Sequence, residues 1–194
     1  MRLDGQLPRF DVTERRHVVV DASPETTYAA MKSLDFARMG PVVEALGELR
    51  RLPERIAAAL AGTAQPETPE SVTMNDVAES DEWVQLAEEP GEEFVFGAVG
   101  KFWRPSIEWV EIEPDEFAEF DRPGYAKLAI GFSVRPYGTD RALLTYEART
   151  ATTDAAARRR FRLYWSVIGP SAGFLMGRAL ARIKAGAESA TAGT

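Results

Sequence analysis

Hydrophobic and polar residues alternate along much of the second half of the chain, and a period of two is typical of half-buried strands. Short segments rich in proline, glycine, aspartate and glutamate separate the alternating stretches. Such short connections favour antiparallel neighbours over crossovers. The pattern predicts strands at residues 71–77, 82–87, 93–100, 107–112, 125–135 and 141–150. A β-branched run at residues 17–22 predicts a further strand ahead of them, which makes a seven-stranded antiparallel sheet.

Helical spacing of hydrophobic residues begins directly after the first predicted strand. Ser23 is placed to cap a helix whose first residue is Pro24. Hydrophobic positions at intervals of three or four continue through residues 41–60. The sequence therefore predicts a helical insert, ending in a loop, at about residues 24–70.

The C-terminal region predicts the longest helix. From Phe161 to residue 187, hydrophobic side chains recur every three or four positions, and Thr153 with Asp154 can cap the start. We expect a helix at about residues 154–188. Pro170, preceded by glycine, should bend it or divide it, because proline removes a backbone donor.

Composition narrows the functional classes. A chain of 194 residues is long enough for one domain with a sizeable core, and we interpret residues 1–194 as a single domain. The net charge of −7, from 30 acidic and 23 basic residues, argues against a nucleic-acid or anionic-membrane surface, because both carry charge of the same sign, although it leaves room for local basic clusters. Cysteine is absent, which excludes disulfides and thiolate sites and fits a reducing compartment. A homodimer is consistent with the sequence.

The N-terminal residues lack the apolar core of a signal peptide. No run approaches the roughly 20 apolar residues that span a bilayer. We therefore expect a cytoplasmic protein without membrane insertion.

The order of elements is a strand, helices, six strands and a long C-terminal helix. Such a sheet can bury its apolar face by curving around the last helix. This layout, together with the segments GKFWRP, PGYAKLAIGFSV, LLTYEART and FRLYWSVIGPSAGF, resembles poorly characterised bacterial members of the START-like superfamily, also called SRPBCC, which includes polyketide cyclases. The resemblance implies an α+β helix-grip fold, in which a curved seven-stranded sheet wraps around the C-terminal helix, with the helical insert after the first strand. It also implies a cavity for an apolar ligand between sheet and helix.

The register of the last hairpin decides which side chains face that cavity. If the loop has an even number of residues, Ile130 lies opposite Glu147 and Leu128 lies opposite Arg149, so both charges point inward. An odd loop with a bulge would turn Tyr146 inward and leave the charges in water. The sequence permits both registers. We favour the inward one, because the two charges can pair with each other and with a polar ligand group.

The candidate ligand-binding residues combine this register with the aromatic side chains near the predicted cavity. Core packing is the ordinary role for any single one of them. Their number nevertheless suits a pocket that stacks against rings or alkyl chains. The ten ligand-binding candidates are Trp103, Leu128, Ile130, Phe132, Thr145, Glu147, Arg149, Phe161, Trp165 and Ile168. Further aromatic candidates for the site are Phe102, Trp109, Tyr146 and Tyr164.

Three functions are consistent with this arrangement. The first, which we favour, is binding of a hydrophobic or aromatic small molecule, lipid-like or polyketide-like. The second is a cyclase or dehydratase in which Glu147 transfers protons and Arg149 polarises a carbonyl or enolate. The third is a protein-interaction domain in which the insert at residues 41–70 contacts a partner and the cavity is vestigial.

Other catalytic chemistry finds little support in the sequence. His17 is the single histidine, which excludes a histidine-based metal cluster. The acidic segments lack the spacing of a calcium loop, and no phosphate loop, dinucleotide fingerprint or nucleophile elbow occurs. We expect no metal and no cofactor. The run of arginines at residues 158–160 is interpreted as a solvated helix face.

Overall fold

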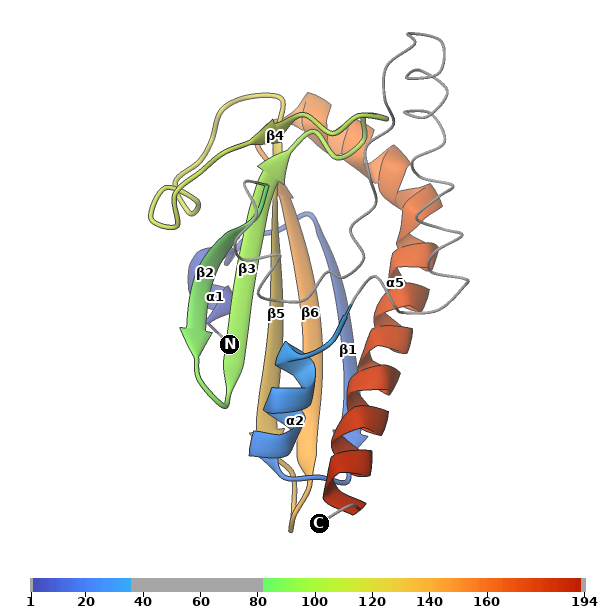
Figure 1. The fold of residues 1–194 in the computed structure, drawn as a ribbon. Helices are drawn as coiled ribbons and strands as arrows, with labels where there is room; N and C mark the ends of the chain where they lie inside the picture. The colour runs from blue at the N-terminus through green and yellow to red at the C-terminus, as the bar shows by residue number, and fades with distance from the viewer. Residues whose placement is uncertain (1, 36–81, 193–194) are drawn as a thin grey trace, which may run out of the picture.

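A curved antiparallel sheet and one long helix dominate the fold (Figure 1). The structure is a computed structural model, and it describes residues 2–35 and 82–192. The strand predicted at residues 71–77 and the helices predicted within residues 41–60 lie outside the described residues. The described sheet has six strands rather than the seven predicted.

The elements follow one another in an order close to that predicted. They are α1 (Leu3–Gln6), β1 (Val12–Val20), α2 (Pro24–Lys32), β2 (Val84–Glu89), β3 (Glu93–Gly100), β4 (Trp109–Val110), β5 (Ala126–Pro136), β6 (Ala142–Thr152) and α5 (Ala155–Ala192). The strands are arranged in the order β1-β6-β5-β3-β2, and β4 pairs with β3. Every pairing is antiparallel.

Two elements differ from the prediction near the N-terminus. Strand β1 begins at Val12, five residues before the β-branched run, because it pairs with β6 along its whole length. The short helix α1 was not predicted. Its four residues have too little hydrophobic periodicity to be recognised, and it is held by contacts with distant strands.

The helix caps follow local sequence signals. The Ser23 hydroxyl accepts a hydrogen bond from the backbone N–H of Thr26, with Pro24 at the first helical position. One carboxylate oxygen of Asp154 accepts from the backbone N–H groups of residues 156 and 157 at 2.7 and 2.8 Å. Both predicted caps are therefore confirmed. Helix α5 is continuous through Pro170, and Figure 1 shows it changing direction in its N-terminal half.

Both faces of the sheet are covered. The inner face packs against α2 and α5, where Phe132, Leu144 and Tyr146 share a core with Met31 and Ile183. The outer face packs against α1 and the segment between β4 and β5 through a second core that includes Leu3, Leu7, Val95 and Phe117. Strand β3 is consequently buried along its whole length. A strand buried on both faces gives no alternation in exposure, which fits the nearly continuous apolar sequence of β3.

The β5–β6 hairpin has the odd register, so the even register that we favoured from sequence is wrong. Pro136 pairs with Ala142, and Tyr146 lies opposite Phe132 on the inner face. The physical reason is the loop of five residues between the paired ends, in which Gly138 and Asp140 both adopt positive φ angles, of 74° and 53°. This loop turns the even-numbered residues of β6 toward α5.

Candidate functional site

An aromatic pocket lies between the inner face of the sheet and the first half of α5. Its volume is about 320 Å³. It is lined by Trp83, Phe102, Ile107, Trp109, Leu128, Thr150, Phe161, Tyr164 and Trp165. Six of these nine side chains are aromatic and none is charged.

The floor of the pocket comes from two neighbouring strands. Leu128 on β5 and Thr150 on β6 are register partners, and both point to the inner face. The opposite wall is one turn of α5, where Phe161, Tyr164 and Trp165 are spaced three and four residues apart and so share a helix face. The rings of Phe161 and Trp165 stack with centroids 5.9 Å apart and an interplanar angle of 21°.

A third wall is formed by the chain around β4. Trp109 on β4 contacts Phe102 edge-on at 5.8 Å between centroids, and Trp83, just before β2, lies 6.1 Å from Trp109. Ring contacts of this kind stabilise a wall beyond the area that they bury, by about 0.5–1.5 kcal/mol each. The wall is therefore built from two segments, the start of β2 and the β3–β4 connection with β4.

An ionic cluster ties the ends of the β3–β4 connection together. The Lys101 ammonium donates to Glu108 at 2.7 Å, and the Tyr125 hydroxyl donates to the same carboxylate oxygen at 2.6 Å. These hydrogen bonds, with the charges of Lys101 and Arg104, lower the pKa of Glu108 to about 2. Glu108 therefore stays ionised at neutral pH and keeps the loop that carries Phe102 in place.

The structure places the ten predicted ligand-binding residues in four locations. Leu128, Phe161 and Trp165 line the pocket, and Trp103 packs against the same aromatic core. Ile130 and Phe132 belong to the adjacent core near α2. Ile168 is half-buried on α5 but is outside the lining. The remaining three, Thr145, Glu147 and Arg149, lie on the outer face of the sheet.

Sequence reasoning missed Trp83, Ile107 and Thr150 as lining residues. Both residues fall inside predicted strands, at residues 82–87 and 107–112, but in the structure Trp83 lies before β2 and Ile107 before β4, so the alternation of a strand does not assign their faces. The even register predicted from sequence placed Thr150 on the outer face of the sheet. A hairpin loop of five residues, recognised from Gly138 and Asp140, would have predicted its inward position.

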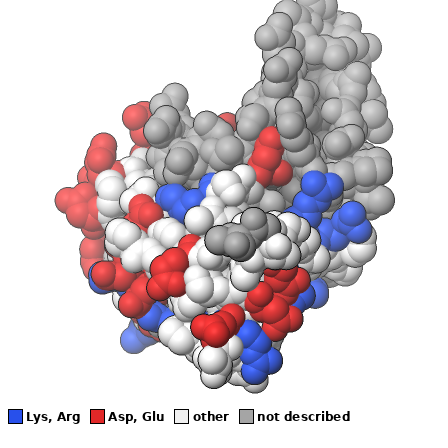
Figure 2. Space-filling model, turned by 60° about the horizontal axis from the view of Figure 1, so that its bottom comes forward, with Lys and Arg blue, Asp and Glu red and all other residues white. Residues whose placement is uncertain are grey.

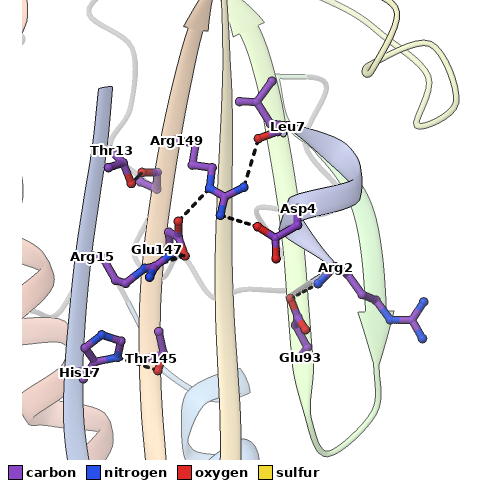
Figure 3. Close-up of polar contacts among 11 residues, drawn as sticks. Arg2, Asp4, Leu7, Thr13, Arg15, His17, Glu93, Thr145, Glu147 and Arg149 are labelled. Atoms are coloured by element: carbon purple, nitrogen blue, oxygen red, sulfur yellow. Dashed lines mark hydrogen bonds and ion pairs between the residues drawn. The ribbon is translucent and has the colours of Figure 1, made fainter. Parts of the chain in front are cut away.

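Glu147 and Arg149 are buried, although they face away from the pocket. Arg149 Nε donates to Glu147 Oε1 at 2.7 Å, while Arg15 donates to Glu147 Oε2 at 2.8 Å (Figure 3). The same Arg149 guanidinium donates to the Leu7 carbonyl at 3.1 Å and to Asp4 Oδ1 at 2.6 Å. The pair therefore holds the segment of α1 against the outer face of the sheet.

Both members of this pair remain ionised. Burial opposes ionisation of Glu147, but the hydrogen bonds and charges of Arg15 and Arg149 outweigh it and lower the pKa of the carboxyl. Burial likewise opposes the charge on Arg149, and the carboxylates of Asp4 and Glu147 raise the pKa of the guanidinium above its ordinary value. Since arginines occupy both oxygens of Glu147, this carboxylate is poorly placed to exchange protons with a substrate.

A larger groove of about 620 Å³ lies between β1 and the C-terminal half of α5. It is open, and its charged side chains are paired with neighbours: Arg16 with Glu14, and Lys184 with Glu188. Lys184 also donates to the Val19 carbonyl at 2.7 Å, which protects an otherwise exposed strand edge. Because these charges form ion pairs and hydrogen bonds within the protein, the smaller aromatic pocket is the better candidate site.

Within residues 2–35 and 82–192, no group of three or more histidine, aspartate or glutamate side chains is arranged to hold a metal ion. The helices in those ranges do not combine the length and hydrophobicity that crossing a bilayer requires. His17, the single histidine, has its Nδ1 2.9 Å from the Thr145 hydroxyl on the outer face.

Comparisons with known proteins reveal only distant similarity. No family model matches the chain. No curated protein sequence matches it either. Among solved structures, a conserved protein from Geobacillus kaustophilus is 10% identical with a TM-score of 0.40, and the alignment covers 92% of this chain and 96% of that one. Protein CV1439 from Chromobacterium violaceum is 14% identical with a TM-score of 0.36, over 91% and 96% of the two chains.

CalU16 from Micromonospora echinospora is 15% identical, with a TM-score of 0.30, over 94% of this chain and 98% of that one. Similarities this low identify neither a ligand nor a reaction.

Proposed function

We propose that this protein binds a neutral, aromatic small molecule in the pocket between the sheet and α5. The observation that carries the proposal is the composition of the lining, in which six of nine side chains are aromatic and none is charged. Burying an ionised ligand group there would be costly, since no opposite charge lies in the lining to pair with it. Ring faces favour planar, aromatic ligands.

The volume narrows the ligand further. Small-molecule pockets span about 300–1,000 Å³, and about 320 Å³ lies at the small end of that range. A ligand of two or three fused rings fits this space better than a long acyl chain. Within the hydrophobic ligands expected from sequence, the pocket therefore favours a compact polyketide-like or other aromatic compound over a lipid.

Two hydroxyl groups lie in the lining and give the pocket a means of orienting a ligand. Thr150 and Tyr164 occupy opposite walls, one on β6 and the other on α5. A carbonyl or hydroxyl group on the ligand would find a hydrogen-bond partner at either wall. The nine described residues of the lining include no carboxyl group, imidazole or amine for proton transfer, so we propose binding rather than cyclisation or dehydration.

The test is a fluorescence titration with N-phenyl-1-naphthylamine, a neutral aromatic probe. We expect saturable binding by the full chain, and we expect Trp165→Leu to weaken the affinity roughly three- to tenfold, through loss of ring stacking. Tyr137→Leu is the matched control, because Tyr137 is exposed at the tip of the β5–β6 hairpin. Unchanged affinity in a folded Trp165→Leu protein, or an equal loss in the control, would contradict the proposal.

A further inference from the structure

Helix α5 presents a stripe of large hydrophobic side chains on the side away from the sheet. Leu163, Val167 and Phe174 are 73%, 70% and 48% exposed. They lie four and seven residues apart, which places them on one face of the helix. Large apolar side chains gathered in one exposed stripe mark a surface that contacts a partner.

Arginines flank this stripe at both ends. Arg159 and Arg162 precede it and Arg178 and Arg182 follow it, and all four are exposed. Within the part of the chain that the structure describes, none of these four forms an ion pair, whereas Arg158 pairs with Asp11. The side chains that flank the apolar stripe are therefore cations whose charge is available to an anionic partner.

The charge of α5 contrasts with that of the rest of the molecule. The helix contains seven basic residues and one acidic residue, although the whole chain has a net charge of −7. In Figure 2, acidic side chains are spread over much of the visible face, and a group of basic side chains lies at its right-hand side. An anionic plane would therefore attract the α5 side of the molecule and repel the remainder.

Three kinds of partner differ in how well they fit this face. A second copy docked symmetrically through α5 would bring the arginines against one another. A nucleic acid would leave the hydrophobic stripe without an apolar contact, since such interfaces are polar. An anionic bilayer fits both the hydrophobic stripe and the arginines. The apolar side chains enter the acyl boundary, while the arginines remain at the level of the lipid phosphates.

We propose that the outer face of α5 docks the protein on anionic membrane surfaces. Leu163, Val167 and Phe174 enter the interface, and the flanking arginines contact lipid phosphates. Tyr164 and Trp165, which line the pocket, lie on the same turns of α5 as Leu163 and Val167. Docking therefore places the pocket close to the bilayer, in which aromatic ligands concentrate. The docking itself does not require an occupied pocket, and it goes beyond the binding function proposed above.

The experiment measures co-sedimentation of the ligand-free full chain with phosphatidylcholine vesicles, with and without phosphatidylserine. We expect binding only when phosphatidylserine is present, and loss of binding at high salt. The double change Arg178→Gln and Arg182→Gln should lower the partition coefficient at least about tenfold. The double change Leu163→Ser and Val167→Ser should lower it to a similar extent, roughly tenfold.

The matched control changes one aromatic residue and one arginine at the tip of the β5–β6 hairpin. Tyr137 and Arg141 are both exposed, and they contact each other there. Tyr137→Ser with Arg141→Gln should leave vesicle binding unchanged. An equal loss in this control, or no preference for phosphatidylserine, would overturn the proposal. Binding of polyglutamate but not of vesicles would also overturn it and would assign the face to an acidic protein partner.

Discussion

Arg149 and Glu147, two residues apart on β6, form a buried ion pair at 2.7 Å on the side of the sheet opposite the pocket. The pair connects three elements, since Arg15 on β1 binds the carboxylate and Asp4 on α1 binds the guanidinium (Figure 3). Its role is therefore to hold the N-terminal segment on the sheet. This explains why two charges occupy a strand position that has no access to the ligand pocket.

Removing Arg149 should destabilise the whole domain. Arg149→Met leaves Glu147 buried with one cation instead of two and releases the Leu7 carbonyl and Asp4. We expect the free energy of unfolding to fall by about 3–5 kcal/mol, the usual cost of breaking a buried pair. Urea denaturation followed by circular dichroism measures it. Arg104→Met is the control, since its ion pair with Glu108 is exposed and should contribute far less to stability.

The same network should make stability depend on acidic pH. The pKa of Glu147 is lowered below its ordinary value of 4.5 in the folded protein. The carboxylate therefore contributes stability above that value, and the contribution is lost as the pH falls through the lower, folded pKa. Melting temperatures measured from neutral pH downward should show wild type above Glu147→Gln, with the difference narrowing below pH 4.5. A difference in melting temperature that stays constant with pH would exclude a contribution from Glu147 ionisation.

Two glycine substitutions should change stability in opposite directions. At Gly97 on β3, a Cβ atom would lie 2.7 Å from Leu86 and 2.8 Å from Phe117 in the outer core. We expect Gly97→Ala to cost about 1–3 kcal/mol through overpacking. At Gly186 on α5, a Cβ meets nothing within 4 Å. Gly186→Ala should therefore stabilise the helix by up to about 1 kcal/mol, and thermal melts of the two proteins compare them directly.

Filling the pocket should abolish probe binding without unfolding the protein. Leu128 is half-buried on the pocket floor, opposite the Phe161 wall, so a larger ring at this position projects into the space of about 320 Å³. We expect Leu128→Trp to weaken N-phenyl-1-naphthylamine binding at least about tenfold, which corresponds to about 1.4 kcal/mol. Circular dichroism checks the fold. Full probe affinity in this variant would place the probe elsewhere.

The parts of the fold that sequence predicted well depend on neighbouring residues. The predicted range 93–100 matches β3, and the caps Ser23 and Asp154 begin helices as expected. A cap needs only a side chain and the backbone within three residues, and a strand needs only its own pattern of side chains. The long C-terminal helix was recognised for the same reason.

The candidate site was predicted only in part. Phe161 and Trp165, predicted from sequence as ligand-binding residues, both line the pocket, because they lie on one face of a helix that sequence periodicity defines. Trp83 was missed because its place depends on how the start of β2 meets the rings of Trp109 and Phe96. Its position is determined by contacts between distant segments, which leave no periodic signal in the sequence.

By itself, the sequence determined the class of each major described element, the antiparallel pairing of neighbouring strands and the apolar face of the last helix. Only the tertiary structure decided which face of the sheet Glu147 and Arg149 occupy. A shift of one residue in the β5–β6 register moves every side chain of β6 to the other face, and the five-residue loop selected one of two registers with similar local patterns. Burial of the two charges then depended on partners far away in the chain: Asp4 and the Leu7 carbonyl accept hydrogen bonds from Arg149, and Arg15 donates to Glu147. Together these hydrogen bonds make that burial favourable.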